Sequence, residues 1–311
     1  MEKLIVSSSP HIHGKSTTQN LMRDVVIALL PAAAAGIVFF GYRAAILLLI
    51  CPLCCVLCEY ICRRVMKRKQ TIKDLSAVVT GLLLAMNLPA LAHPLVAVFG
   101  CIVAIVVVKQ MFGGIGQNFV NPALTARIIL LNSFPARMSA WSAPFVYGGD
   151  AMTTATPLEA YAAGQSTGYL DLFLGNTAGC IGETSALALL LGGIYLIARG
   201  VIKPTIPVAY IGTAAAFSFI LGRDPLFDIL SGGLILGAFF MATDYTTSPM
   251  YKWGKLVFAV GCGAITMLIR SFGALAEGVS YAIVLMNILV PLIERYIKPR
   301  AFGKERKNRE A

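Results

Sequence analysis

The residues with the clearest chemical potential form the short run from Asp150 to Thr156. Three threonines, Thr153, Thr154 and Thr156, stand beside one carboxylate in a sequence that is otherwise strongly apolar. Such a hydroxyl cluster is poor material for a bilayer span and common in a loop. A threonine hydroxyl can be esterified to the phosphate of a flavin nucleotide, and a flavin in this loop would make the chain an electron carrier.

Thr156 also has a purely structural interpretation. Pro157 follows it and favours an extended conformation, which would expose the hydroxyl to a modifying enzyme. Glu159 stands three positions after Thr156, so Thr156 could instead cap a helix that begins at Pro157, with Glu159 completing a capping box. Capping boxes are common and flavin-bearing threonines are rare, so these residues alone favour the cap.

The composition predicts an all-α, polytopic membrane protein. Apolar residues make up 57% of the chain and charged residues 13%, against about 45–50% and about 25% in soluble domains. No apolar core of a cleavable signal peptide precedes Asp24. About ten stretches approach the roughly 17–25 residues that cross hydrocarbon. They cover approximately residues 24–41, 43–62, 75–92, 94–112, 121–136, 181–198, 204–222, 226–243, 255–272 and 275–293.

The distribution of Lys and Arg predicts the orientation of these spans. With both termini in the cytoplasm, most of the 26 basic residues are cytoplasmic, as the positive-inside rule requires. The exceptions are Arg127, within a predicted span, and four outer arginines, Arg43, Arg137, Arg223 and Arg270. This topology places the loop with Thr156 on the extracytoplasmic side. The net charge of +11 then reflects the orientation of the chain in the membrane. We expect no nucleic-acid binding, because aromatic residues that could stack on bases do not alternate with the basic residues.

The longest predicted loop divides the chain into three parts. Residues 1–136 hold an N-terminal segment and five spans, residues 137–180 form the loop, and residues 181–311 hold five further spans and a basic tail. Because five is odd, the second block begins from the opposite side of the membrane, which is typical of an inverted repeat. Similar short sequences at Asp74 and Asp228, in the third and eighth spans, agree with this interpretation.

Two segments interrupt the predicted spans. Asn87-Leu88-Pro89 ends the third span, and we interpret it as a turn at the membrane interface. The polar run from Gly113 to Pro122 precedes the fifth span and is equally compatible with a turn and with a re-entrant segment that lines a cofactor. Within it, Asn121 followed by Pro122 indicates a helix cap and first turn.

Arg127 is the ionisable side chain that the sequence places most clearly inside the membrane. It could neutralise the negative charge of a cofactor phosphate or of a reduced flavin. Alternatively it could pair with Glu59, Glu183 or Asp244, and the sequence does not separate these options. Five cysteines between residues 51 and 62 form one helical stripe, which we interpret as packing rather than as a metal site.

Three ordered segments resemble the signature motifs of the RnfD/NqrB family. They are Ser8-Ser9-Pro10-His11-Ile12 with Asp24–Ala32, then Gly113–Ala123, then Asp150–Thr156. The last is similar to the family's flavin-attachment motif, Asp-x-x-(Ser/Thr)-Gly-Ala-(Thr/Ser), with Thr156 at the acceptor position. Thr154 stands where that motif usually has glycine, which makes Thr154 a minor alternative acceptor. The resemblance covers essentially the whole chain.

The resemblance implies FMN joined to Thr156 by a phosphoester bond. Asp150, Thr153, Thr154 and Ala155 would complete the motif that an ApbE-type flavin transferase reads on the outer side, and Arg127 is a further candidate for contact with the cofactor. The resemblance also implies a urea-transporter-like fold of two inverted five-helix repeats, and it allows a second, noncovalent riboflavin in the helix bundle. Few residues precede the first span, which favours the RnfD branch over the NqrB-like branch with its longer N-terminal extension.

The resemblance further implies a role in the bacterial cytoplasmic (inner) membrane. RnfD-like chains work with the other Rnf subunits, RnfA, RnfB, RnfC, RnfE and RnfG, in a complex that couples electron flow from reduced ferredoxin to NAD with movement of Na⁺ or H⁺. Candidate cation ligands are Asp244, Thr243 and Asn121. Two alternatives stay open: an NqrB-type subunit of a sodium-pumping NADH:quinone oxidoreductase, and a small-solute channel or transporter of the same fold.

Overall fold

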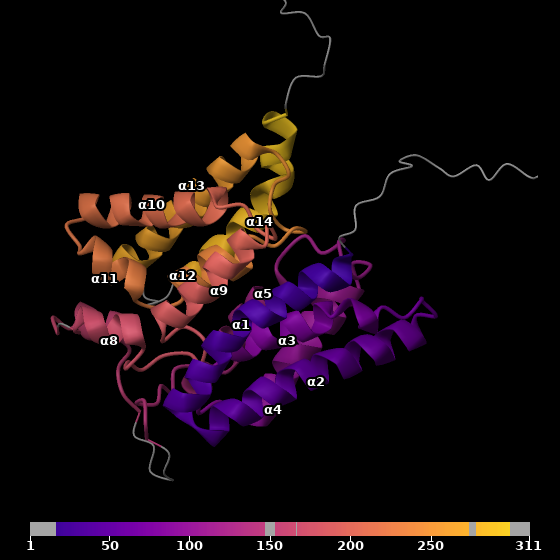
Figure 1. Ribbon diagram of the computed structural model, residues 1–311, viewed down its shortest axis with the longest axis horizontal. Coiled ribbons are helices and arrows are strands. Elements are labelled where there is room, and N and C mark those ends of the chain that lie inside the picture. The colour runs from indigo at the N-terminus through magenta and orange to yellow at the C-terminus, as the bar shows by residue number, and fades with distance from the viewer. Residues whose placement is uncertain (1–16, 147–152, 166, 274–277, 299–311) are drawn as a thin grey trace, which may run out of the picture.

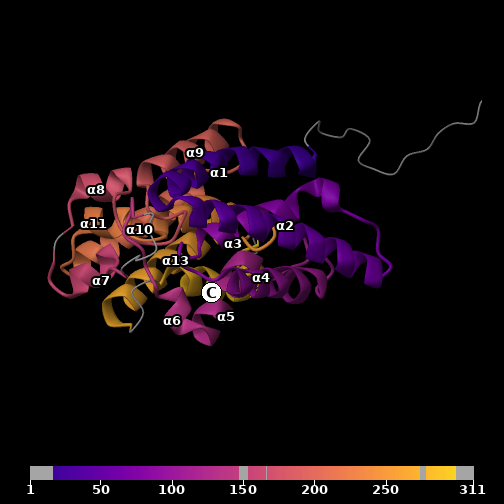
Figure 2. The same ribbon diagram turned by 90° about the horizontal axis from the view of Figure 1, so that it is seen from below.

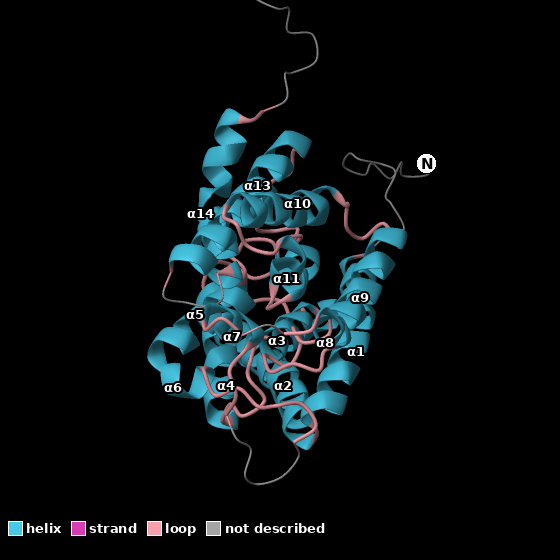
Figure 3. Ribbon diagram, turned by 90° about the vertical axis from the view of Figure 1, so that its left-hand side faces the viewer, coloured by secondary structure: helices cyan, strands magenta, loops and turns pink. Residues whose placement is uncertain are grey.

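The computed structural model describes residues 17–146, 153–165, 167–273 and 278–298. Within these ranges the chain consists of helices joined by turns, with two isolated β-bridges and no strand. The views in Figures 1 and 3 show helices throughout the described chain. The predicted all-α class is therefore confirmed for this part of the molecule. Asp150 lies outside the described residues.

The first half begins with two long helices that fold back on each other. Gly41 joins them with φ 69°, a left-handed conformation that glycine adopts without strain. The elements up to the loop are α1 (Thr18–Phe40), α2 (Tyr42–Val65), η1 (Ile72–Asp74), α3 (Ser76–Met86), α4 (Pro94–Ile102), η2 (Val103–Gln110), α5 (Pro122–Ser133) and α6 (Pro135–Met138). Of these, η2 is π-helical and continues α4 without a break.

The second half starts with two short helices and ends with two long ones. Its elements are α7 (Pro157–Ala162), α8 (Tyr169–Leu174), α9 (Ala186–Ala198), α10 (Thr205–Ile220), α11 (Pro225–Leu230), α12 (Leu234–Leu236), η3 (Gly237–Met241), α13 (Lys252–Phe272) and α14 (Val279–Tyr296). Like η2, η3 is π-helical and extends the helix before it. Single π-helical turns inside helices often mark functional sites.

Four helices in the described residues, α1, α2, α13 and α14, are long and apolar enough to cross a membrane. Shorter apolar helices cover residues 76–86, 94–110, 186–198 and 205–220. These helices agree with the prediction of a multi-pass membrane protein. Two predicted spans are broken, however: α3 already ends at Met86, and the stretch 226–243 is divided among α11, α12 and η3.

Glycines allow the helices to approach closely. A Cβ added at Gly192 in α9 would lie 2.1 Å from the Ala28 carbonyl oxygen of α1, and one added at Gly81 in α3 would lie 2.5 Å from the Cα of Pro52 in α2. Small residues have this role in membrane helix bundles, where backbone contact replaces a hydrophobic driving force. Accordingly α1 packs on α9 and α2 on α3, and Figure 2 shows α9 beside α1.

The segment Asn87–Pro89 ends α3 in a turn that lies inside the molecule. Its residues are buried, and Leu88 has no exposed surface. The Leu88 carbonyl accepts a hydrogen bond from the Ile181 N–H at 3.0 Å, and the Met86 carbonyl accepts one from the Gly182 N–H at 2.9 Å. Because these partners come from the chain itself, α3 can end inside the molecule without leaving its carbonyls unsatisfied.

The short helices α7, α8 and α11 lie at one end of the molecule (Figure 2). In Figures 1 and 2, α8 lies at the left, whereas α1 begins and α2 ends at the right. The basic residues that follow α2 are therefore far from α7 and α8. At the α8 end, the exposed Tyr169 hydroxyl donates to the half-buried Asp224 carboxylate, which lowers the pKa of Asp224 and ties α8 to the start of α11.

Candidate functional site

Thr156 caps α7 through a complete capping box. Its Oγ1 accepts a hydrogen bond from the Glu159 N–H at 3.3 Å, and Glu159 Oε2 accepts one from the Thr156 N–H at 2.9 Å. The backbone of Thr156 is extended, with φ −69° and ψ 159°. Both structural predictions for this position, the extended conformation before Pro157 and the cap, are confirmed.

The prediction that Thr156 would be exposed is wrong. Thr156 is 8% exposed because it faces a cavity, whereas Thr153, Thr154 and Ala155 are on the surface. The segment before α7 is held by Trp141, whose carbonyl accepts a hydrogen bond from the Thr154 N–H at 3.0 Å. Of the threonines in the described part of the motif, only Thr156 is directed inwards.

The cavity at Thr156 has a volume of about 250 Å³, and we call it the Thr156 cavity. Its polar lining residues include Arg127, Glu159 and Glu183, and its apolar walls include Leu158 and Leu172. The fold therefore brings Arg127 of α5 to the same cavity as Thr156 of α7. Most ligand sites combine apolar walls with a few polar groups in this way.

Arg127 is held in place by a network of buried hydrogen bonds. One terminal nitrogen donates to Asn87 Oδ1 at 2.8 Å and to Ser280 Oγ at 3.1 Å, and the other donates to Cys180 Sγ at 3.3 Å. Among the acidic partners considered from the sequence, Glu183 shares the Thr156 cavity with Arg127. Asn87 directly follows the buried end of α3, so the position of this helix end orients Arg127.

A second cavity, of about 100 Å³, lies between the two halves, and we call it the Lys109 cavity. Asp244, Thr243 and Asn121, the candidate cation ligands, all line it, and so does Lys109. No group of three or more His, Cys, Asp or Glu residues in the described ranges is arranged as a metal site. Cation binding there would therefore depend on carbonyl, hydroxyl and amide oxygens beside Asp244.

The polar run before α5 forms part of the wall of the Lys109 cavity. Ile115, Asn118 and Asn121 line it, which supports the cavity-lining alternative for this segment over a simple turn. Asn121 Oδ1 accepts hydrogen bonds from the Ala123 N–H at 3.0 Å and the Leu124 N–H at 3.3 Å, which confirms its prediction as a helix cap.

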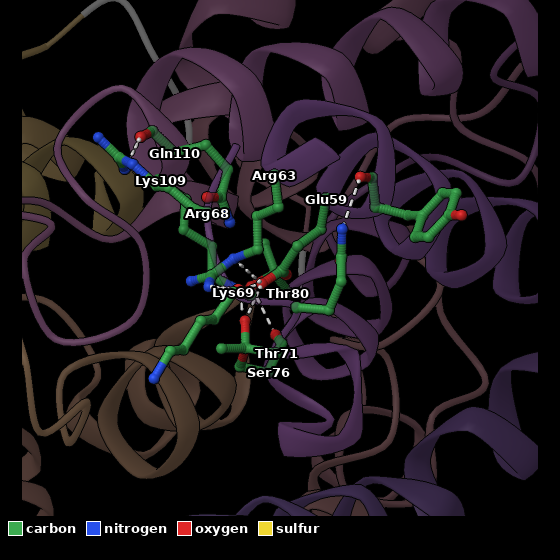
Figure 4. Close-up of polar contacts among 11 residues, drawn as sticks. Glu59, Arg63, Arg68, Lys69, Thr71, Ser76, Thr80, Lys109 and Gln110 are labelled. Atoms are coloured by element: carbon green, nitrogen blue, oxygen red, sulfur yellow. Dashed lines mark hydrogen bonds and ion pairs between the residues drawn. The ribbon is translucent and has the colours of Figure 1, made fainter. Parts of the chain in front are cut away.

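Sequence reasoning missed Lys109. Its Nζ lies 2.8 Å from Glu59 Oε2 and 2.8 Å from Ser76 Oγ, and its side chain is 3% exposed. Figure 4 shows Glu59 at the centre of this cluster, with Thr71 donating to its Oε1 at 3.0 Å and Arg63 Nε 3.5 Å from the same oxygen. Lys109 lies near the end of the apolar stretch 94–112, so it was grouped with the cytoplasmic bases. A useful signal was Glu59, an acid inside the second predicted span that needed a partner.

One methionine connects the two cavities. The Asn87 side-chain amide donates to Met241 Sδ at 3.8 Å, and the Asn121 side-chain amide donates to the Met241 carbonyl at 3.4 Å. Asn87 bonds to Arg127 of the Thr156 cavity, and Asn121 lines the Lys109 cavity. Met241 of η3 therefore links Arg127 of the Thr156 cavity to Asn121 of the Lys109 cavity through two asparagine side chains.

Comparison with known proteins identifies the family. A model of the NQR2, RnfD, RnfE family matches residues 5–303, nearly the whole chain. The chain belongs to this family. The resemblance inferred from the three signature motifs is thereby confirmed.

Similar proteins of this family match the chain over nearly its full length. The D subunit of the Na(+)-translocating ferredoxin:NAD(+) oxidoreductase complex of Acetobacterium woodii is 49% identical, over 99% of this chain and 98% of that protein. The D subunit of the proton-translocating ferredoxin:NAD(+) oxidoreductase complex of Clostridium ljungdahlii is 42% identical, over 97% of this chain and 96% of that protein. The D subunit of the ion-translocating oxidoreductase complex of Vibrio cholerae is 36% identical, over 96% of this chain and 99% of that protein. These relatives confirm the similarity to the RnfD branch.

Proposed function

We propose that the chain is the RnfD component of an ion-translocating ferredoxin:NAD oxidoreductase of the bacterial cytoplasmic (inner) membrane. Relatives with the corresponding name match it over almost all of its length, and its helices suit a membrane-embedded subunit. Its partners would be the other Rnf subunits, RnfA, RnfB, RnfC, RnfE and RnfG. The relatives named for sodium and for proton translocation are both similar to the chain, so either Na⁺ or H⁺ is a candidate for the moved ion.

We further propose that Thr156 carries FMN through a phosphoester bond. The observation that supports this most is that Thr156 and Arg127 face the same cavity. FMN, when attached, would supply transfer of one or two electrons. The guanidinium of Arg127 would offset the added negative charge, which is costly to bury in a region of low dielectric without a cation nearby. Leu158 and Leu172 would cover the ring and exclude water.

The cap and the attachment are chemically compatible. In the capping box Thr156 Oγ1 is an acceptor, so its hydroxyl proton is not needed to hold α7. Ester formation replaces this proton and leaves a lone pair for the Glu159 N–H. Because Thr156 is buried and α7 has only six residues, an ApbE-type transferase would reach the hydroxyl when α7 opens locally.

The Lys109 cavity is the proposed site for a noncovalent riboflavin and for the translocated cation. Phe239 and Phe240 supply apolar walls, and Asn118 and Asp244 supply polar edges, so the lining has the chemistry for a second, noncovalent riboflavin, but the cavity would have to widen to hold it. Asp244, with Thr243 and Asn121, would also attract a cation when a nearby flavin is reduced. Such charge compensation is one way in which electron transfer drives ion uptake.

The order of helices supports two inverted repeats. The series α1, α2, α3, α4–η2 and α5 is matched by α9, α10, α12–η3, α13 and α14. Equivalent helices meet each other, α1 with α9 and α5 with α14, as expected around a pseudo-two-fold axis. In this arrangement α7 and α8 are extracytoplasmic, opposite the basic segment that follows α2 (Figure 1).

The proposal is tested with Thr156→Ala in the intact complex. We expect the denatured chain to lose its flavin fluorescence under ultraviolet light and the complex to lose ferredoxin:NAD activity. Thr154→Ala tests the alternative acceptor, and we expect it to keep both, since Thr154 is exposed and outside the cavity. Fluorescence that survives Thr156→Ala would contradict the attachment site. A wild-type chain without flavin would favour a solute transporter, and NADH-dependent quinone reduction would favour an NqrB-type subunit.

A further inference from the structure

The helix that carries Thr156 cannot fix its own position. Helices as short as α7, with six residues, are unstable in isolation, so its placement depends on the surfaces that it touches. Its main apolar contact is a small cluster separate from the principal core, in which Leu158 packs with Leu172 of α8 and Phe227 of α11. Tyr161, near the end of α7, is packed against the same cluster.

The ring of Tyr161 makes two directional contacts with the second half of the chain. It stacks on Phe227, with ring centroids 4.6 Å apart and an interplanar angle of 22°. The Arg223 guanidinium carbon lies 4.8 Å from the centroid of the Tyr161 ring, within the range of a cation–π contact. Both contacts depend on ring orientation, so they restrict rotation of α7 as well as its distance.

Arg223 is itself rigidly anchored. It bonds Asp228 in a bidentate manner, Nε to Oδ2 at 2.9 Å and a terminal nitrogen to Oδ1 at 2.8 Å. Asp228 is 1% exposed and also accepts from Ser218 Oγ at 2.6 Å, while Arg270 donates to its carbonyl at 2.6 Å. The Tyr161 ring therefore rests on groups held by α10, α11 and α13.

We propose that Tyr161 and Arg223 are positioning residues for the group carried by Thr156. This inference rests on the proposed function. Thr156 caps the same short helix that carries Tyr161 in its last turn, so a shift of the Tyr161 ring moves the attachment point relative to Arg127. Neither side chain is among the residues that line the Thr156 cavity, so both act through α7.

The test uses Tyr161→Ala in the intact complex. A redox titration of each complex is recorded, and the signal of the Thr156→Ala complex is subtracted from it. The difference reports the midpoint potential of the flavin on Thr156 alone. We expect Tyr161→Ala to keep its covalent flavin but to shift the midpoint potential of that flavin, and to lower turnover roughly tenfold or more, since a displacement of about 1 Å can have large effects on rate. The KM values for ferredoxin and NAD should not change. Tyr161→Phe keeps the stacked ring and should restore both quantities.

A matched control is Tyr42→Ala in α2. Tyr42 also has an arginine over its ring, Arg43 at 5.9 Å, but it lies on α2 and therefore has no influence on the position of α7. We expect this variant to behave as wild type. If Tyr161→Ala prevents assembly of the complex, Tyr161→Leu is used instead, because leucine preserves apolar bulk without the stacked ring. The midpoint potential of the flavin and the turnover are then measured in this variant.

An unchanged potential and turnover in the alanine or leucine variant would overturn the positioning role while leaving the proposed function intact. A wild-type chain that shows no covalent flavin in a denaturing gel would overturn both. A shifted potential that Tyr161→Phe does not restore would also contradict the inference, because the phenylalanine ring retains the stacking surface.

Discussion

Lys109 Nζ lies 2.8 Å from Glu59 Oε2, although the two residues are 50 positions apart in the chain. The pair joins η2 to α2 at the edge of the Lys109 cavity, and both side chains are almost completely buried (Figure 4). Ser76 and Thr71 supply further hydrogen bonds, so each charge has more than one partner.

The first prediction concerns this pair. Glu59→Gln should destabilise the chain by about 3–5 kcal/mol, because it leaves the Lys109 ammonium buried without its counterion. Lys109→Met should cost less, because Arg63 stays 3.5 Å from the Glu59 carboxylate. The free energy of unfolding of the double variant should fall by less than the sum of the losses in the two single variants. Thermal unfolding of the purified chain in detergent measures this, and strictly additive losses would show that the two side chains do not interact.

A second prediction concerns the capping box. Glu159→Ala removes the acceptor of the Thr156 N–H and should destabilise α7 by about 0.5–2 kcal/mol. Hydrogen exchange at the first amides of α7 should become faster, while exchange in α13 should not change. Glu159→Gln is the control, because glutamine can complete a capping box. Equal exchange in the alanine and glutamine variants would mean that this hydrogen bond does not stabilise the helix.

A third prediction separates the attachment of the flavin from its use. Arg127→Met should retain flavin on Thr156, since the transferase reads the motif Asp150–Thr156 and Arg127 lies outside that motif, yet turnover should fall more than about tenfold because the buried positive charge is lost. Arg127→Lys should restore turnover only in part, since one ammonium cannot reach Asn87, Ser280 and Cys180 together. Gel fluorescence and ferredoxin:NAD assays report the two effects, and full turnover in Arg127→Met would exclude an electrostatic role.

A fourth prediction concerns the contact between α1 and α9. Gly192→Ala would place a methyl group 2.1 Å from the Ala28 carbonyl oxygen, so the helices must separate, at a cost of about 1–3 kcal/mol. Gly212→Ala in α10 meets nothing within 4 Å and serves as the control. Thermal unfolding compares the two variants. Similar stability in both would show that α9 can move away from α1 without loss.

The sequence was informative wherever one segment determines its own structure. Hydropathy located the helices, and the pairs Thr156–Pro157 and Asn121–Pro122 correctly marked helix starts, because caps depend on residues only two or three positions apart. The composition of the chain likewise indicated the all-helical class, since isolated strands leave backbone groups unpaired in lipid.

Long-range relationships could not be predicted in this way. Nothing local indicates that Lys109 pairs with Glu59 or that Asn87 orients Arg127, because these contacts depend on how helices pack. The burial of Thr156 was missed for the same reason. An extended residue before proline is expected to project outwards, but here the cavity lies on the side toward which it projects.

Met241 contacts residues that belong to the surroundings of both cavities. Its sulfur accepts a hydrogen bond from Asn87, which orients Arg127, and its carbonyl accepts one from Asn121, which lines the Lys109 cavity. A shift of Met241 would therefore disturb the hydrogen bonds of Asn87 and Asn121 together. This residue offers a short path of contacts from Arg127 to the wall of the Lys109 cavity that does not require a whole helix to move.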